Sequence, residues 1–428
     1  MKAHHLILPL VYIAILAACN KAEDSQGTLP EDEKKPDDTE VQVSYIQLNR
    51  AEMNVASSAN DFGVTLFQLL SEKTDEDLLL SPLSLSLDLT LCSGGAQGET
   101  QEEILTTLGF KGYQVEDVAS YYKKMVNGLV TLDPSVTFQS ANSIWTDIDY
   151  PISDSYSEYA KEYFDADLSS LNLGLKESLK EINEWCEEET NGMIKKVLDD
   201  SKDPDNKAVS YLLNAIYYNG GWRLPFDETI EDGPFHGSKG ESEVPYLTAE
   251  HNYPYHETET AQFVSLPLGG GAFSLILAVP HVGETVGTVL AAMRASDFFF
   301  YSRVDPVTVR VPKFSMDKTL AEDLKDALMQ LGINHAFQMK TADFFNMFSL
   351  APPPGERFFI DIIRQVSRFQ LDEHGAEAAS VTIIGMDVSS LGEEITPTPR
   401  TVVADHPFLF ALVENTSRTI LFLGQKVN

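Results

Sequence analysis

Two histidine–glutamate pairs are the residues of this sequence that come nearest to the spacing of a metal or acid–base site. They are Glu250-His251 and His256-Glu257, with Tyr253 and Tyr255 between them. Imidazole and carboxylate groups bind zinc, but a zinc site uses three or four such ligands, and no further clustered histidine or cysteine follows. We therefore expect a hydrated loop here and keep a surface metallohydrolase as the weakest of three functional hypotheses.

Other catalytic signatures are absent from the sequence, which has no GxSxG, HExxH or CxxC motif and no glycine-rich phosphate loop. Asp203-Pro204-Asp205-Asn206 resembles a calcium loop only slightly, because the glycine and the later glutamate are missing. Cys92 and Cys186 fall in predicted helices, where a cysteine is more often a small buried hydrophobe than a nucleophile. We expect neither an enzyme nor a cofactor or metal.

The stretch from Asp372 to Arg400 is the most unusual part of the chain. Loops are normally polar and about 4–6 residues long, whereas this one is long and rich in small and apolar residues. Alternate positions from Ala376 to Val388 are Ala, Ala, Ser, Thr, Ile, Met and Val, and the charged Glu377 and Asp387 fall in the other phase. This period of two is typical of a strand with one buried face. We interpret the stretch as a loop that can become a strand.

The elements around this loop indicate an α+β fold with large, mostly antiparallel sheets, because helices dominate the first half without regular alternation with strands. Apolar spacing and caps predict helices over Ala51–Glu72, Leu83–Cys92 (begun by Ser81 and Pro82), Lys176–Glu189 and Asp317–Leu331. β-Branched and aromatic runs predict strands over Val209–Tyr218, Gln262–Leu268, Phe273–Val279, Pro306–Val311, Phe358–Leu371, Phe408–Val413 and Thr419–Leu423.

Composition excludes several classes of protein. The 428 residues include 43% hydrophobic residues, enough for a large core and too many for a disordered chain. The net charge of −34 argues against nucleic acid or heparin as partners, since both need a basic surface. Three cysteines are too few for a disulfide-stapled scaffold.

From about Ala51 to Asn428 the sequence resembles the serpin family. The motifs that carry the resemblance occur in the family's order: Leu80-Ser81-Pro82-Leu83-Ser84, Ser140 to Trp145, Ile182 to Trp185, Thr190-Asn191-Gly192, Leu213 to Trp222, Pro225-Phe226, Val311 to Phe314, Leu331-Gly332-Ile333, Ala404 to Phe410 and Leu421 to Gly424. The resemblance implies the serpin fold, with three β-sheets, about eight or nine helices and an exposed reactive-centre loop over about residues 373–400.

The resemblance also implies an inhibitor of serine proteases, and sometimes of cysteine proteases, that acts as a suicide substrate. In the family the protease attacks the loop, forms an acyl-enzyme, and is trapped when the cleaved loop inserts as a strand into the main sheet of a metastable protein. Insertion requires small residues in the hinge, and this sequence supplies Glu373, Gly375, Ala376, Ala378, Ala379 and Ser380. The alternative is a serpin-fold surface binding protein that has lost inhibition.

Residues that gate the sheet are implied by the same resemblance. Ser81, Ser84 and Asn214 match the family's shutter, Gln365 stands in place of its shutter histidine, and Trp222 matches its breach tryptophan. A glutamine can still donate and accept hydrogen bonds but does not titrate near neutral pH. The segment from Ala96 to Phe110, which carries heparin-binding lysines in some serpins, is acidic here, so heparin activation is not expected.

The family register places the scissile bond about 16 residues after Glu373, which gives Ser389–Ser390. Counting back from Pro407 points instead to about Thr396, but insertion length controls how far the protease is carried, so we prefer the first count. A small residue after Val388 suits elastase-like proteases. Met386 or Leu391 as the cleaved residue would suit chymotrypsin-like or cathepsin-like enzymes, and Arg400 would suit trypsin but lies close to the next strand.

The N-terminus reads as a lipoprotein signal. Leu6 to Ala17 is an uncharged apolar run of about 12 residues, too short to span a bilayer, and it leads into Leu16-Ala17-Ala18-Cys19, which resembles a bacterial lipobox. We expect residues 1–18 to be removed and Cys19 to be lipidated, with an ordinary signal peptide as the alternative. Residues 19–44 then form an acidic tether, and residues 45–428 the serpin domain.

These features predict a monomer anchored through Cys19 to a membrane of the cell envelope, at the outer membrane or cell surface and outside the cytoplasm. Proteases are the expected partners. The acidic stretch at Glu23-Asp24 loosely resembles surface-export signals of Bacteroidota lipoproteins.

Overall fold

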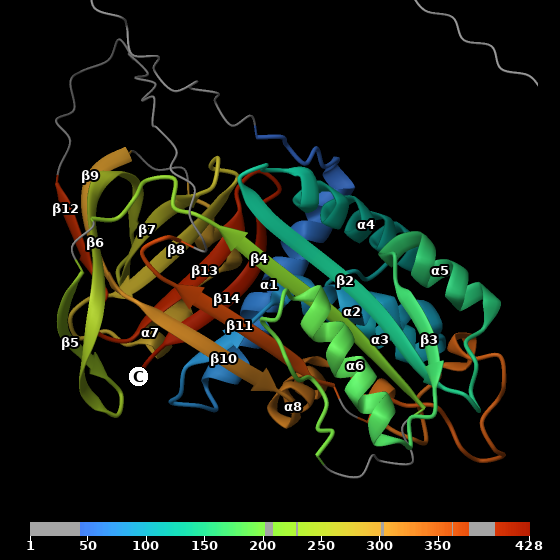
Figure 1. Cartoon of the computed structure of the whole chain (residues 1–428). Helices are drawn as coiled ribbons and strands as arrows, with labels where there is room; N and C mark the ends of the chain where they lie inside the picture. The colour runs from blue at the N-terminus through green and yellow to red at the C-terminus, as the bar shows by residue number, and fades with distance from the viewer. Residues whose placement is uncertain (1–42, 202–208, 228–229, 301–303, 362, 376–398) are drawn as a thin grey trace, which may run out of the picture. The chain divides into compact units, whose positions relative to one another are not determined.

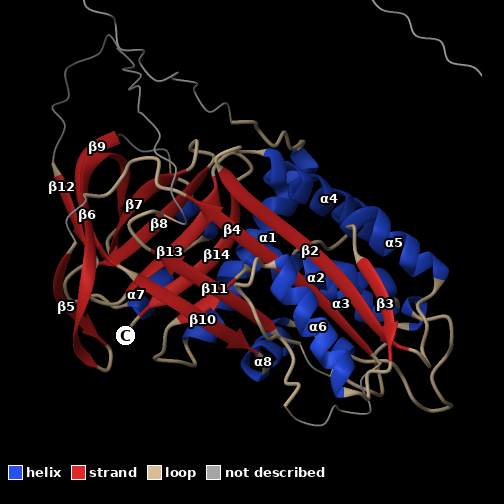
Figure 2. Cartoon of the chain, in the orientation of Figure 1, coloured by secondary structure: helices blue, strands red, loops and turns tan. Residues whose placement is uncertain are grey.

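The computed structural model describes residues 43–201, 209–227, 230–300, 304–361, 363–375 and 399–428. These residues form eight α-helices, three short 3-10 helices and three β-sheets (Figures 1 and 2), which confirms the predicted α+β class. The helices are α1 (Arg50–Ser71), α2 (Pro82–Gly95), α3 (Gly98–Thr107), α4 (Val115–Thr131), α5 (Asp154–Phe164), α6 (Lys176–Glu189), α7 (Val286–Ala292), α8 (Glu322–Leu331), η1 (Ala295–Phe298), η2 (His335–Phe337) and η3 (Phe345–Met347). None of the described helices is both long and apolar enough to cross a membrane.

The largest sheet has nine strands in the order β1-β14-β13-β8-β7-β6-β9-β12, with β5 paired to β6 outside this path. A second sheet has the order β3-β2-β4, and a third contains β10 and β11. The strands are β1 (Leu78–Leu80), β2 (Val136–Asp147), β3 (Asp167–Leu171), β4 (Ser210–Gly220), β5 (Glu231–Gly237), β6 (Gly240–Glu257), β7 (Ala261–Leu268), β8 (Phe273–Pro280), β9 (Val304–Pro312), β10 (Phe314–Leu320), β11 (Gln365–Leu371), β12 (Arg400–Val403), β13 (Phe408–Glu414) and β14 (Thr419–Lys426).

The two small sheets each end in a strand that has a ladder on one side. β4 pairs antiparallel with β2 along its whole length, from Ser210↔Thr146 to Gly220↔Val136. β11 pairs antiparallel with β10, from Gln365↔Leu320 to Leu371↔Phe314. No ladder joins β4 to β11 within the described residues, so the two sheets remain separate.

Two apolar cores hold the layers together, and β4 separates them. Its residues Leu212, Ile216 and Tyr218 face the main core, whereas Tyr211, Leu213 and Ala215 face a smaller cluster beneath α6. Successive side chains of a strand point to opposite faces. Even-numbered residues of β4 therefore face the main core, and odd-numbered residues face α6, which lies over β2 and β4 in Figure 1.

Most of the helices and strands predicted from the sequence are present in the structure. The predicted bounds of α6 are confirmed at both ends, and Ser81 does cap α2, where the Ser84 amide donates to the Ser81 hydroxyl over 3.3 Å. The predicted helix from Asp317 was wrong in its first part, because residues 317–320 pair with β11 and α8 starts only at Glu322. The predicted strand over Phe358–Leu371 was too long. Only residues 365–371 form β11, whereas Phe358 packs against the rings of Phe348 and Tyr150.

The histidine–glutamate pairs lie in a strand and not in the expected loop. β6 extends through Glu257 because residues Tyr246 to Pro254 pair with β9 and residues Tyr255 to Glu257 pair with β7. His251 contacts the Pro225 carbonyl at 2.9 Å, while His256 packs against the rings of Phe263 and Phe300. Five positions separate the two histidines, so they point to opposite faces. No group of three potential metal-ligating side chains is found in the part of the chain that the structure describes.

Candidate functional site

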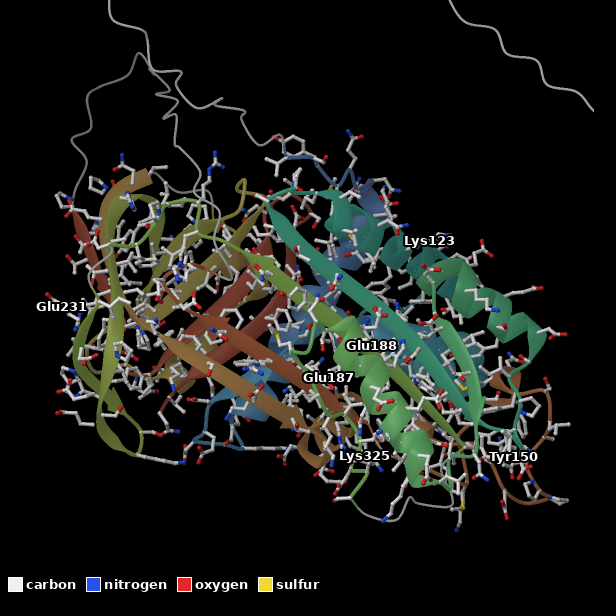
Figure 3. The ribbon with its side chains drawn as sticks, viewed as in Figure 1. Lys123, Tyr150, Glu187, Glu188, Glu231 and Lys325 are labelled. Carbon is white, nitrogen blue, oxygen red and sulfur yellow. The ribbon has the colours of Figure 1, made fainter. Side chains whose placement is uncertain are left out.

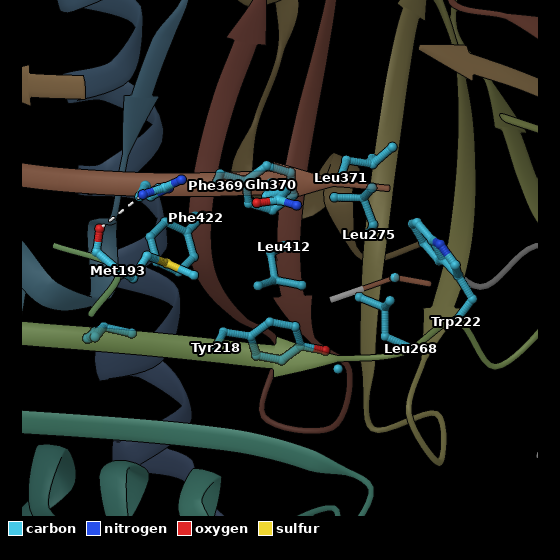
Figure 4. A pocket seen from close by; sticks show the side chains of 14 residues that line it. Met193, Tyr218, Trp222, Leu268, Leu275, Phe369, Gln370, Leu371, Leu412 and Phe422 are labelled. Carbon is cyan, nitrogen blue, oxygen red and sulfur yellow. Dashed lines mark hydrogen bonds between the residues drawn. The ribbon is translucent and has the colours of Figure 1, made fainter. Parts of the chain in front are cut away.

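A cavity separates β4 from β11 (Figure 4). It has a volume of about 60 Å³, and most of its lining is apolar. Its lining side chains come from both facing strands and from the large sheet beneath them: Ile216 and Tyr218 of β4, Phe369 and Leu371 of β11, Leu275 of β8, Leu412 of β13 and Phe422 of β14.

The two strands that border the cavity each carry a backbone edge without a ladder partner in the described structure. Strand edges present rows of N–H and C=O groups that can pair with an added strand. An apolar floor between two such edges is suited to a strand whose one face is apolar. This arrangement can receive a peptide backbone.

A tight turn, residues 372–375, follows β11 at one end of the cavity. The Asp372 carbonyl accepts hydrogen bonds from the Trp222 indole N–H at 2.9 Å and from the Gly375 amide at 3.2 Å. The Asp372 carboxylate accepts a further one from the His374 amide at 2.9 Å. Trp222 is buried and packs edge-on against Phe226. The chain is therefore fixed in position where it leaves β11.

Gly375 ends this turn in a conformation that favours glycine. Its φ is +84°, and a Cβ built on it would lie 2.6 Å from the Trp222 amide nitrogen and 2.7 Å from the Gly221 Cα. Gly375 can approach so closely because it forms an antiparallel bridge with Gly221, the residue after β4. The chain that follows Gly375 thus starts at the edge of β4.

An ion pair holds the other side of the turn. The carboxylate of Glu373 contacts the ammonium group of Lys313, which lies between β9 and β10. The hydrogen bond from Lys313 lowers the pKa of Glu373 below its usual value. A carboxyl with a lowered pKa stabilises the folded state above its unfolded pKa, and this contribution decreases as the pH falls through the folded pKa.

Comparisons with known proteins identify this arrangement. The profile of the serpin family, described as serine protease inhibitor, matches residues 57–428. The chain belongs to the serpin family. It is similar to a serine protease inhibitor of the jellyfish Cyanea capillata, at 30% identity over 87% of this chain and 98% of that protein. It is also similar to human neuroserpin, at 26% identity over 85% of this chain and 89% of that one.

Solved structures agree with this assignment. The thermophilic serpin tengpin, in its native state, is 25% identical and superposes with a TM-score of 0.77 over 90% of this chain and 96% of its own. The predicted serpin fold is therefore confirmed. Serpins are protease inhibitors rather than enzymes, although some members do not inhibit, so the family supports inhibition of proteases in general terms.

The structure brings together three of the four predicted shutter residues of this serpin. The side-chain amide of Gln365 accepts from the Ser81 amide at 2.8 Å and donates to the Ser81 carbonyl at 2.9 Å. The Ser81 hydroxyl donates to the Leu421 carbonyl at 2.7 Å and accepts from the Ser84 amide. Gln365 thus attaches the start of β11 to Ser81, which caps α2 and bonds to β14.

Asn214, the fourth shutter residue, bonds to the other half of the sheet. Its side-chain N–H₂ donates to Asn142 at 2.9 Å and to Ser140 at 3.2 Å, both on β2. Its side-chain oxygen is buried without a hydrogen-bond partner within the described residues. Asn214 makes no hydrogen bond to Gln365 within the described residues, so the predicted shutter residues form separate networks on β11 and β4.

Arg400 begins β12 and pairs with Val307 of β9. Its guanidinium lies over the ring of Tyr255, at 5.2 Å from the centroid, and 3.6 Å from the Glu257 carboxylate. A protease needs its target residue in an extended and accessible segment. These contacts therefore count against Arg400 as the cleaved residue, in agreement with the sequence argument.

The remaining loop residues of the prediction lie outside the described residues. They are Ala376, Ala378, Ala379, Ser380, Met386, Ser389, Ser390 and Leu391. Cys19 also lies outside them. Burial raises the pKa of the Cys92 and Cys186 thiols to about 12, which disfavours the nucleophilic thiolate form near neutral pH.

Sequence reasoning missed Lys313 as the partner of the hinge glutamate. Lys313 belongs to a family motif that the sequence does show, Val311 to Phe314. Its pairing with Glu373 depends on the bend between β9 and β10, and spacing along the chain gives no sign of it.

Substitution of Gly375 tests the close approach between the hinge and β4. Gly375→Ala should lower the free energy of unfolding by about 2–3 kcal/mol, because the methyl group meets both a positive φ and the Gly221-Trp222 backbone. Gly355→Ala is the matched control, since Gly355 has a φ of +90° and nothing within 4 Å of an added Cβ. It should cost only about 1 kcal/mol. If thermal unfolding shows the same loss of unfolding free energy in both variants, the close approach of Gly375 to the Gly221-Trp222 backbone is contradicted.

Proposed function

We propose that this serpin inhibits serine proteases as a suicide substrate, by inserting its cleaved loop between β4 and β11. The observation that carries the proposal is the antiparallel bridge between Gly375 and Gly221 at the end of the cavity. The bridge is a first pair in the ladder that an inserted strand would form with β4. The hinge is thus positioned to extend this ladder.

The bridge also supplies a register for the inserted strand. In an antiparallel ladder, each residue after Gly375 meets the β4 residue the same number of positions before Gly221. Ala376 would then meet Gly220, Ala378 would meet Tyr218, and Ser380 would meet Ile216. Directly paired residues share a face of the sheet.

This register accounts for the alternation in the loop sequence. Even-numbered residues of β4 face the main core, so the loop residues paired with them would face it too. Those loop residues, at even positions from 376 to 388, carry no charge. Glu377 and Asp387 would point to the opposite face. The same small residues that allow entry at the hinge therefore also fit the cavity beside Tyr218.

The energy for trapping a protease would come from pairing both exposed edges. β4 has 11 residues, Ser210–Gly220, which would pair with residues 376–386 in this register. Each new backbone hydrogen bond contributes a net free energy of about 0.5–1.5 kcal/mol, so roughly a dozen of them contribute about 10 kcal/mol. Burial of loop side chains in the cavity would add to this difference.

The register supports cleavage at Ser389–Ser390 in preference to Met386. The β4 ladder ends at Ser210, which would meet Met386. A cut after Ser389 leaves the whole paired segment plus a short connection to the acylated protease, whereas a cut after Met386 leaves no connection beyond the ladder. Leu391 is compatible with the ladder. With Val388 before a small cleaved residue, elastase-like serine proteases are the proposed targets, and chymotrypsin-like or cathepsin-like enzymes are the alternatives.

Incubation with pancreatic elastase, followed by denaturing electrophoresis, tests this function. We expect a covalent complex that survives denaturation, and a released C-terminal peptide whose mass begins at Ser390. Cleavage of the loop without a complex, and without a rise in thermal stability of the cleaved protein, would favour the alternative of a non-inhibitory surface binding protein.

Two neighbouring alanines test the register of insertion. Ala378→Asp should turn the inhibitor into a substrate, because its carboxylate would enter the apolar cavity beside Tyr218, at a cost of several kcal/mol. Ala379→Asp is the matched control, because residue 379 would pair with Tyr217 and face away from the main core. It should keep most complex formation. Equal loss in both variants, measured as moles of inhibitor consumed per mole of elastase blocked, would overturn the register.

We further propose that residues 1–18 are a signal and that the protein is anchored to the cell envelope through lipidated Cys19. The lipobox-like sequence and the acidic segment that follows it support this proposal. Cys19→Ser should move the protein from the membrane fraction to the soluble fraction of the expressing bacterium. Ser25→Ala, in the tether, is the control. Retention of the Cys19→Ser protein in the membrane fraction would count against lipidation.

A further inference from the structure

The segment that follows α6, residues 190–200, contacts both halves of the divided sheet and is here called the crossing segment. It contains no helix or strand. Its buried side chains, Ile194 and Val197, pack with Trp145 of β2 and Ala215 of β4 in the cluster beneath α6. Val366 of β11 packs against the same cluster.

On the α6 side, Asn183 binds the crossing segment tightly. Its side-chain oxygen accepts from the amides of Val197 and Leu198, each at 2.9 Å, and its N–H₂ group donates to the Leu198 carbonyl at 2.9 Å. Thr190 closes the turn after α6 by accepting from the Ile194 amide at 2.9 Å. Asn191 adds a hydrogen bond to Gln139 of β2 at 2.7 Å. The segment is thus attached to the half of the sheet that contains β4.

On the other side, two arginines of the β11 half donate hydrogen bonds to the crossing segment. Arg364, which precedes β11, donates to the Val197 carbonyl at 2.7 Å. Arg368, in β11, donates to the Met193 carbonyl at 3.3 Å, as the dashed line in Figure 4 shows. Arg368 also lies 3.5 Å from the Asp317 carboxylate of β10. The two arginines therefore fasten the β11 half of the sheet to a segment that belongs to the β4 half.

The hydrogen bond between Arg368 and Met193 lies at the cavity where a strand would enter the sheet. Met193 and Arg368 both line the cavity between β4 and β11. A strand paired on both sides would set β4 and β11 about 9–10 Å apart, which is two strand spacings. Because Asn183 fixes the crossing segment to α6 by three hydrogen bonds, a change in separation would strain the arginine contacts first.

We propose that Arg364 and Arg368 are positioning residues that set the rate at which a strand enters the sheet. They tie the Met193 and Val197 carbonyls to β11 and delay separation of the two halves. Release of the two arginines, with the crossing segment remaining on α6, then precedes completion of the ladder. This inference rests on the proposed function, and it concerns residues that touch neither the protease nor the cleaved bond.

A synthetic peptide with the sequence of residues 376–388 tests the proposal on the full chain without any protease. Its rate of annealing is followed by native gel electrophoresis. We expect Arg364→Ala and Arg368→Ala each to anneal the peptide roughly three- to tenfold faster, since each loses one charge-assisted hydrogen bond. Arg368→Lys, which keeps the charge, should anneal it at an intermediate rate.

Arg357→Ala is the matched control, because Arg357 also donates to a backbone carbonyl, that of Ala342 at 3.2 Å, but outside the crossing segment. Its annealing rate should equal that of the unmodified protein. An unchanged annealing rate in both Arg364→Ala and Arg368→Ala would overturn the proposal. An equal increase in Arg357→Ala would also overturn it, because the faster annealing would then be a general effect of destabilisation.

A second measurement uses the unmodified protein and so does not depend on the folding of variants. Hydrogen exchange of the Arg364 and Arg368 guanidinium groups, followed by NMR, should become faster once the peptide is bound. Exchange of the Val197 and Leu198 amides, which donate to Asn183 of α6, should stay slow. Unchanged protection of both guanidinium groups would overturn release of the arginines, and loss of protection at the Val197 and Leu198 amides would overturn retention of the crossing segment on α6. Failure of the elastase experiment alone, with faster annealing in the arginine variants, would reject the inhibitory function and leave this inference intact.

Discussion

Backbone hydrogen bonding is left incomplete along the facing edges of β4 and β11, and the other features of the site depend on this. Within the described residues, each strand has one ladder, to β2 or to β10, and each faces an apolar cavity on its other side. Edge groups of this kind favour any strand that can pair with them. The fold must therefore keep both edges in place and keep the cavity open to a strand of suitable sequence.

Separate polar contacts hold each half. Gln365 bonds to both backbone groups of Ser81, so that β11 is attached to α2 by two hydrogen bonds that need no titratable group. The Asn214 side chain donates to Asn142 and so attaches β4 to β2. Contacts that connect the halves include the turn at Gly375, the two arginine bonds to the crossing segment, and the packing of Val366 against the cluster beneath α6. A sheet built in this way can widen without loss of either ladder.

Gln365 stands where the family resemblance implies a histidine, and its hydrogen bonds show what this difference changes. An imidazole has one donor and one acceptor only in its neutral form. The amide of Gln365 presents both at any pH, and the Ser81 amide and carbonyl use both. Protonation therefore does not alter this attachment, whereas protonation of Glu373, whose pKa is lowered by Lys313, would remove its ion pair at the hinge.

Local patterns were sufficient to predict the elements whose stability is local. Ser81 and Pro82 located the start of α2, and the apolar spacing of Lys176–Glu189 gave α6 at both ends. Residues 317–320 were misassigned because their pairing with β11 overrides helical spacing, and pairing between distant segments is not visible in a local window. For the same reason the sequence did not reveal Lys313 as the partner of Glu373, or the separation of Asn214 from Gln365.

The period-two pattern after Gly375 differs from these cases, because it agrees with a partner that the structure does provide. Alternation alone cannot say which face of a strand is buried or what it pairs with. The Gly375–Gly221 bridge supplies the register, and the division of β4 between two cores supplies the faces. In the proposed insertion, they would put every uncharged alternate residue on the cavity side. If the register were displaced by one residue, Glu377 and Asp387 would face the apolar core, and insertion would be opposed by the cost of burying both carboxylates.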